Sequence, residues 1–281
     1  MSTSRREGAE RRLRRIRLHT PEGKEPPDLL PVREYLDSMF DDVQVRLIRS
    51  PFARLSGPTL DRVARQIAQA RTKDPTQARQ THIPTEAEVD YERRAIRGTA
   101  RLGGIPYDGR SLLDLYSDIM SRELDPTAAS IVFTNRLITT FSRDDLRHHL
   151  RMLVCGFPSI ISVPGVVEAP ARPREYYVLR RELEVMGAAP FQLERLKDEF
   201  KGRFIGYGDE AVIEVLKGLA LQAVMFHMTL EPFCDSRYCR LFNAHWQEEL
   251  VQSQLRGDRF CPRHAALVAR LRRRPTMNWL S

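Results

Sequence analysis

Two short-spaced pairs of potential metal ligands lie near the C-terminal end of the chain, and they constrain its fold more than any other feature. Cys234 and Cys239 are separated by four residues, and Cys261 and His264 by two. Zinc in structural sites takes four such ligands in a tetrahedron, and two short-spaced pairs are a common way for a chain to supply them. Folding must therefore bring both pairs to one point, across the 21 residues that separate them.

The sequence around these pairs is typical of helices. The run NAHWQEELVQSQL, residues 243–255, is predicted to form a helix between the pairs. Pro262 suits the first turn of a second helix, CPRHAALVARL, because the missing amide hydrogen of proline is not needed there. Four protein ligands leave no open position, so the site is predicted to be structural.

We therefore predict a zinc clasp over residues 234–264 that holds one structural Zn²⁺ per chain. Its expected ligands are Cys234, Cys239, Cys261 and His264. His245 lies beside the first pair and is an alternative fourth ligand. The other interpretation is an accidental cluster without a metal. Cys155 stands apart in the apolar run MLVCGFP and is expected to be a small buried side chain.

The remainder of the chain alternates between strand and helix patterns. Strands are predicted over residues 14–20, 43–49 and 129–141, the last as one central strand. Helices are predicted over 29–40, 58–71, 85–98, 109–124, 142–154, 175–186, 190–201 and 208–230. Ser142 is the expected N-cap of the helix over 142–154. The proline-rich segment 158–177 is predicted to be an edge strand or hairpin, since proline breaks a ladder.

These patterns predict the fold class α/β: one domain with a central sheet, packed helices and a helical, metal-bound C-terminal segment. The expected organisation is a basic disordered tail over 1–12, the domain over 13–272 and a second tail over 273–281. Residues 1–17 carry a net charge of +5 and the last twelve residues +4, out of +8 for the whole chain. The body is therefore close to neutral, and we expect no nucleic-acid partner beyond non-specific contact through the basic ends.

No uninterrupted apolar run reaches the ~18 residues that a membrane span needs. The longest apolar stretch, 218–230, is shorter and contains His227. The N-terminal residues are charged but lack the apolar region of a secretory signal. We therefore expect a cytoplasmic protein with no membrane contact.

The clasp and the segment before it resemble a known family of zinc peptidases, the archaemetzincins. That family carries His-Glu-x-x-His-x-x-Gly-x-x-His-Cys, then Cys-x-Met after four residues, and later Cys-x-x-Cys, whose cysteines bind a structural zinc. Here Cys234-DSRY-Cys239 matches the first cysteine pair, and Cys261-Pro-Arg-His264 takes the place of the closing pair. The resemblance implies a zincin-like α/β domain with a structural zinc site.

A second resemblance covers about residues 12–270. The runs IVFTNRLITTF, CGFPSIISVPGVVEAPARPREYYVLR and GLALQAVMFHMTLEPFCDSRYCRLFNAHWQEEL are similar to an uncharacterised prokaryotic family, a domain of unknown function labelled as a metallopeptidase. This resemblance implies descent from a metallopeptidase.

The catalytic motif of the archaemetzincins does not carry over residue by residue. AVMFHMTLEPFC stands in place of HExxHxxGxxHC. Ala223 and Phe233 fall on two zinc-binding histidines, and Val224 falls on the general-base glutamate. His227 falls on the remaining histidine, whereas Leu230 and Leu241 replace the glycine and the methionine. A zincin needs three ligands, an open position and a carboxylate base, so the standard site is incomplete.

His227 is thus the one catalytic candidate, and the other interpretation is a core histidine bonded to a backbone carbonyl. Glu168, Arg174 and Glu175 lie on a proline-stiffened segment that suits the rim of a peptide-binding site, or an ordinary structured loop. Two functions follow from these observations. The chain is a zinc metallopeptidase relative with a rebuilt or lost hydrolytic site, or a pseudoenzyme: a zinc-stabilised, non-enzymatic module that binds a peptide or protein.

Overall fold

A five-stranded sheet forms the centre of the computed structural model, which describes residues 11–23, 26–200, 202–256, 259–273 and 276–277. Its strands are β3 (Gln44–Ile48), β2 (Arg15–His19), β5 (Ala128–Thr134), β9 (Ser159–Ser162) and β8 (Leu153–Val154), in that spatial order. The first four run parallel, and β8 pairs antiparallel with β9 at one edge. All seven residues of β5 are buried, as expected for a central parallel strand.

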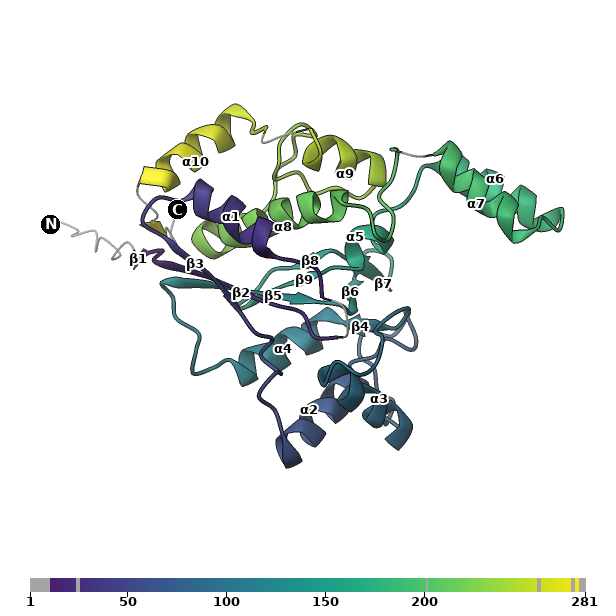
Figure 1. Cartoon of the computed structure of the whole chain (residues 1–281), viewed down its shortest axis with the longest axis horizontal. Coiled ribbons are helices and arrows are strands. Elements are labelled where there is room, and N and C mark those ends of the chain that lie inside the picture. The colour runs from purple at the N-terminus through teal and green to yellow at the C-terminus, as the bar shows by residue number, and fades with distance from the viewer. Residues whose placement is uncertain (1–10, 24–25, 201, 257–258, 274–275, 278–281) are drawn as a thin grey trace, which may run out of the picture.

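Helices cover both faces of this sheet, which makes the molecule a mixed α/β fold (Figure 1). One face carries α1 (Leu30–Met39) and the long α8 (Ala211–Thr229), with α9 (Gln247–Gln254) and α10 (Pro262–Arg273) beyond them. The opposite face carries α2 (Gly57–Gln69), α3 (Glu86–Ile96) and α4 (Gly109–Ile119). Each face has its own apolar cluster, so the sheet separates two cores.

A smaller sheet, in the order β4 (Pro106–Asp108), β6 (Leu137–Ser142) and β7 (Arg147–Arg151), lies beside the main sheet. Two predictions are wrong here. Residues 129–141 do not form one strand, because the chain turns after Thr134 and β6 joins the smaller sheet. Residues 142–154 form no helix either, because β7 pairs with β6 in a hairpin.

The third wrong prediction concerns the proline-rich segment. Its strand, β9, is completely buried between β5 and β8 and is not an edge strand. Pro158 directly precedes the strand and Pro164 follows it, so neither proline removes a ladder hydrogen bond. The short helix α5 (Gly165–Glu168) follows.

The predicted apolar helix over 208–230 is present as α8. By length and composition α8 is able to span a membrane, which corrects the expectation that no segment is long and apolar enough. In this fold 67% of its most apolar window is buried inside the protein, and core helices of soluble proteins share that composition.

A helical hairpin of α6 (Arg174–Val185) and α7 (Pro190–Glu199) projects away from the body (Figure 1). Its buried residues Tyr176, Leu196 and Phe200 form a small cluster separate from the two main cores. At the other end of the molecule, Arg11–Arg12 (β1) pair antiparallel with Thr276–Met277 (β10). Two residues of each segment expected as a tail therefore form a small sheet, and Arg273 belongs to α10. The other residues of those two segments lie outside the described residues.

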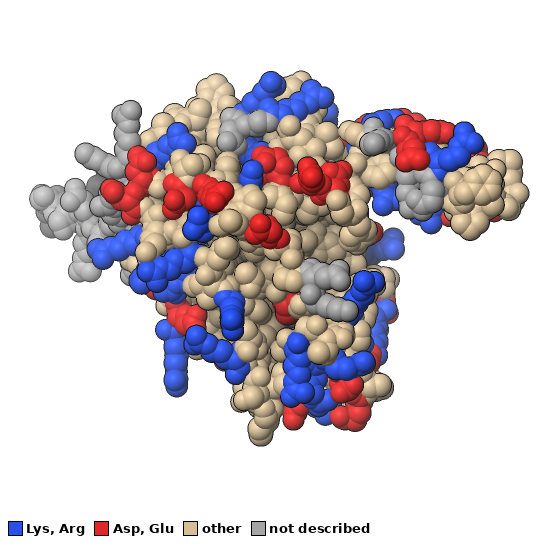
Figure 2. All heavy atoms as spheres, viewed as in Figure 1, with Lys and Arg blue, Asp and Glu red and all other residues tan. Residues whose placement is uncertain are grey.

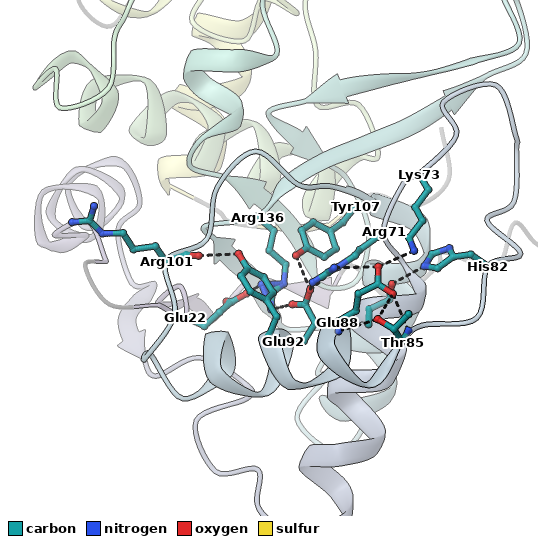
Figure 3. Close-up of polar contacts among 12 residues, drawn as sticks. Glu22, Arg71, Lys73, His82, Thr85, Glu88, Glu92, Arg101, Tyr107 and Arg136 are labelled. Carbon is teal, nitrogen blue, oxygen red and sulfur yellow. Dashed lines mark hydrogen bonds and ion pairs between the residues drawn. The ribbon is translucent and has the colours of Figure 1, made fainter.

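A buried ion network that was not predicted from the sequence joins α3 to both sheets (Figure 3). Arg136 follows β5 and is fully buried between two carboxylates: its guanidinium lies 3.2 Å from Glu22 and 2.9 Å from Glu92. Glu92 also accepts a hydrogen bond from Arg71 at 2.9 Å and one from the hydroxyl of Tyr107 at 2.8 Å. These groups come from five separate segments, so they hold the helical layer against the sheets.

Candidate metal centre and the neighbouring cavities

Folding brings the four predicted clasp residues to one point. The sulfurs of Cys234, Cys239 and Cys261 and a ring nitrogen of His264 all lie within 4.8 Å of one another. Cys234 Sγ is 3.8 Å from Cys261 Sγ, and His264 Nδ1 is 3.6 Å from Cys239 Sγ and 3.2 Å from Cys261 Sγ. A tetrahedral zinc with Zn–S of about 2.3 Å and Zn–N of about 2.0 Å requires S···S edges of about 3.8 Å and S···N edges of about 3.5 Å. The cluster therefore could hold a metal such as zinc with little rearrangement.

Backbone turns shape the first half of this cluster. The amide of Ser236 donates to Cys234 Sγ at 3.4 Å, and the amide of Cys239 donates to the carbonyl of Ser236 at 3.0 Å. The amide of Cys234 donates to the carbonyl of Leu241 at 2.8 Å, which closes the loop on itself. These hydrogen bonds hold the backbone of the loop that carries Cys234 and Cys239.

The cluster is also tied to the main core. Arg240, next to Cys239, is fully buried; it donates to Glu214 of α8 at 2.7 Å and to the carbonyl of Gln254 at 2.6 Å. Gln222 of α8 donates to the carbonyl of Phe242 at 3.1 Å. Because Cys239 and Leu241 belong to the main apolar cluster, a change at the metal centre is transmitted directly to α8.

Burial raises the pKa of Cys239 to about 12, so without a cation this thiol keeps its proton at neutral pH. Burial also lowers the pKa of His264, which favours the neutral imidazole that a metal binds. The donor set is thus three sulfurs and a neutral nitrogen, a combination found in structural zinc sites. Zinc binding would replace the thiol protons.

His245, the alternative fourth ligand, does not belong to this group. Its side chain is exposed, while its backbone amide donates to Glu249 at 3.0 Å and its carbonyl accepts from Ala171 at 2.9 Å. His264 takes the fourth corner of the cluster instead.

The positions that match the catalytic motif do not converge on one site. Ala223 and Val224 are buried in the core of α8, at 1% and 0% exposure. His227 is 5% exposed, and its Nε2 lies 3.1 Å from the carbonyl of Pro126, as expected for a core histidine. Burial lowers the pKa of His227. Among the described residues, the clasp is the one group of three or more possible metal ligands.

His227 lines a cavity of about 500 Å³ at the start of β5. The remaining walls come from the loop before β5, from Ala128 and Ser130 of β5 itself, and from residues 157–158. Sequence reasoning missed this cavity, although Ser130 within the β-branched run of β5 was a possible sign of a polar contact there.

A second cavity, of about 370 Å³, lies along the edge strand β8. It is bounded by Leu219 and Gln222 of α8, by Phe233, and by the segment 242–245 that follows the metal loop. Phe233 thus faces this cavity, whereas His227 faces the first one. Two positions that a zincin uses for one metal are therefore directed at different spaces.

The three predicted rim residues lie near the second cavity but do not form its walls. Glu168 is exposed at the end of α5, next to Ala169 and Pro170, which do line it. Arg174 and Glu175 are exposed at the base of the α6–α7 hairpin, where Glu175 pairs with Arg203 at 3.4 Å. Burial, followed by the nearby charge of Glu168, raises the pKa of Tyr207 to about 12.

The model of the "Probable metallopeptidase family (DUF6775)" matches residues 14–271. The chain belongs to this family. The match covers the whole main sheet, both helical layers and the metal centre, so this DUF6775 protein is a metallopeptidase-like protein with a possible Cys₃His metal site. No curated protein matches the chain.

Two solved structures are similar in fold to this DUF6775 protein. One is archaemetzincin from Methanopyrus kandleri, 13% identical, with a TM-score of 0.44 over 91% of this chain and 93% of that one. The other is a zinc-dependent peptidase from Methanocorpusculum labreanum, 12% identical, with a TM-score of 0.40 over 90% of this chain and 99% of that one. Membership of the family rests on the family model and not on these two likenesses.

Proposed function

We propose that this DUF6775 protein is a zinc-stabilised, non-enzymatic module that binds peptides in a groove retained from a peptidase ancestor. The observation that carries the proposal is the separation of the two sites. The possible metal centre has four protein ligands and no open position. The groove is the second cavity, along β8, and it contains Phe233 at the position of a catalytic histidine in the zincin motif. A zinc ion at the clasp would stabilise the fold and would activate no water.

The groove suits an extended peptide. Within the described parts of the chain, β8 is the edge strand of the main sheet and pairs with β9 alone, and a peptide strand would add at its other side. The cavity beside it offers apolar walls from Leu219 and Phe233 together with the polar side chains of Gln222 and Asn243. Backbone pairing would supply affinity, and this cavity would select a side chain.

A nucleic-acid partner has less support. On the face shown in Figure 2, acidic and basic side chains are interspersed over the body and form no single basic surface. Binding of nucleic acid usually depends on such a surface.

Hydrolysis remains the second candidate, because the family itself is described as a probable metallopeptidase. One experiment separates the two functions. The purified protein is analysed for zinc per chain and incubated with casein and a peptide library, with and without a chelator. One zinc per chain and no chelator-sensitive cleavage are expected. Two zinc ions per chain, or cleavage that a chelator abolishes, would contradict the proposal.

Peptide binding is tested by fluorescence anisotropy with peptides selected from the same library. Phe233→Glu places a charge in the groove and is expected to weaken binding at least about tenfold. The matched control is Phe191→Glu, an exposed phenylalanine on α7 outside the groove. Equal affinity of the two variants would rule out the groove as the binding site.

A further inference from the structure

The cavity beside His227 is a separate space with its own chemistry. Of its eight lining residues, five are apolar: Leu124, Pro126, Ala128, Phe157 and Pro158. Its volume of about 500 Å³ lies within the range of small-molecule sites, which are mainly apolar with a few polar groups that fix orientation. It shares no lining residue with the groove along β8, so a ligand here would be independent of the proposed peptide site.

One wall of this cavity is a fixed aromatic surface. The ring of Phe157 lies edge-on to the imidazole of His227, with centroids 5.5 Å apart and planes at 66°. It also contacts the ring of Phe226 at 5.4 Å. Ser117 donates to the carbonyl of Phe157 at 2.8 Å, which fixes the backbone behind the ring. Such a wall favours another flat ring, because aromatic rings gain from edge-to-face and offset contacts.

Ser130 of β5 also lines the cavity and carries an uncharged hydroxyl. Ser130 is 5% exposed, and its Oγ is buried with no hydrogen-bond partner within the described part of the chain. A buried hydroxyl without a partner costs free energy. A ligand that brings its own hydroxyl into the cavity would recover that hydrogen bond.

The charges at the cavity favour an uncharged ligand over an ionic one. Asp125 is the one lining residue with a formal charge, and its Oδ2 is paired with Arg15 at 2.5 Å. Its Oδ1 accepts from the amide and the hydroxyl of Thr127, at 2.8 and 2.9 Å. An anion would be repelled by Asp125, and a cation would have to compete with Arg15.

From these contacts we infer that the cavity binds an uncharged aromatic ring that carries one hydroxyl group, that is, a phenol. The ring lies against Phe157 and His227, and its hydroxyl exchanges hydrogen bonds with Ser130. A phenol of this kind is either a free small molecule or a tyrosine side chain of a peptide. Phenols have pKa values near 10, so the ligand is neutral at physiological pH.

The test uses 4-fluorophenol and fluorobenzene, two probes that differ in the hydroxyl group alone, titrated into the full-length protein and followed by ¹⁹F NMR. 4-Fluorophenol is expected to bind saturably, and up to about tenfold more tightly than fluorobenzene, which is the effect of one hydrogen bond. The ring-proton resonances of His227, assigned with His227→Gln, are expected to shift because of the ring current of the bound probe.

Ser130→Ala is expected to reduce the affinity for 4-fluorophenol to that for fluorobenzene and to leave the affinity for fluorobenzene unchanged. The matched control is Ser253→Ala, which removes another buried serine hydroxyl on α9, far from this cavity in the sequence. Circular dichroism shows whether both variants are folded. If Ser130→Ala fails to fold, the inference is still tested by the affinities of the two probes for the parent protein and by the shift of the His227 resonances.

N-acetyltyrosine amide, added as a competitor, distinguishes the two sources of the phenol. Displacement of 4-fluorophenol indicates a tyrosine side chain, and binding of the free phenol without displacement indicates a small molecule. The inference is overturned if 4-fluorophenol does not bind saturably, if both probes bind the parent equally, or if the His227 resonances do not move.

Discussion

Single side chains decide the stability of this protein at two buried places, the metal centre and the ion network around Glu92. Around Glu92, charged groups from distant segments meet in a region without solvent. At the metal centre, Cys239 and His264 are buried, whereas Cys234 and Cys261 are half-buried. Their arrangement therefore contributes more than the same groups would at the surface. The metal centre could be predicted from the sequence because its ligands form two local pairs. The ion network could not, because Glu22, Glu92 and Arg136 are far apart in the chain and each resembles a surface residue.

We expect Cys239→Ser to lose bound zinc and to lower the free energy of unfolding by on the order of 5 kcal/mol, since metal binding to a structural site contributes directly to folding. Elemental analysis and urea unfolding measure the two effects. Cys155→Ser is the control, because Cys155 is partly buried but lies outside the cluster. Equal zinc content in the two variants would rule out Cys239 as a ligand.

Glu92→Gln is expected to lower the free energy of unfolding by about 3–5 kcal/mol, because it leaves Arg71 and Arg136 without a full counter-charge in a buried site. The control is Glu86→Gln on the same helix, whose partner Arg65 is largely exposed. An exposed pair contributes about 0–1 kcal/mol. The free energies of unfolding of both variants are measured by chemical denaturation. Similar decreases in the two variants would contradict a stabilising role of the network.

His19 and His227 make stability depend on pH. Burial lowers the pKa of both below the usual value of about 6.5. Below pH 6.5 the unfolded chain therefore takes up protons that the folded chain does not. The free energy of unfolding consequently decreases as the pH is lowered, until the pH reaches the lower pKa values of the folded state. Urea unfolding at pH 7.5 and 5.5 is expected to show this loss, and His227→Gln to show a smaller one. The same loss in His227→Gln and in the parent would exclude His227 as a source.

At the scale of helices and strands, the sequence predicts the secondary structure correctly where a local periodicity determines it. The prediction fails where pairing with a distant segment determines it. The apolar helix α8 and the hairpin helices α6 and α7 lie where they were predicted. The spacing of Leu146, just before β7, and Leu150 within it is also that of a helix, but residues 147–151 pair with β6 instead and His148 makes contacts with distant parts of the chain. Its imidazole lies 3.1 Å from Thr139 Oγ1 and 3.0 Å from the carbonyl of Gln77.

The α6–α7 hairpin is expected to unfold independently of the body, because its small cluster is separate from both main cores. Leu196→Ala removes part of that cluster, and such truncations cost about 2–5 kcal/mol locally. Hydrogen exchange over residues 174–199 is expected to accelerate while the exchange of α8 and the melting temperature of the body stay unchanged. A parallel increase in α8 would show that the hairpin and the body unfold as one unit.

For the whole molecule, the arrangement of layers separates the possible metal centre from the positions that match the catalytic motif. The clasp is attached to α8 through Arg240 and Gln222, so loss of the metal would disturb the core. Two of the positions that match the catalytic motif have no comparable polar contacts, because Ala223 and Val224 are apolar side chains buried in the core.

The pairing of β1 with β10 makes the described backbone close to a ring, since it joins residues near the two ends of the sequence by strand hydrogen bonds. New chain ends can therefore be introduced at another position by circular permutation. A circular permutant that joins residue 281 to residue 1 and begins at Gly187, in the turn between α6 and α7, should keep every strand pairing of the main sheet. The order in which the layers are synthesised would then be reversed, with the zinc ligands made before the strands that they support.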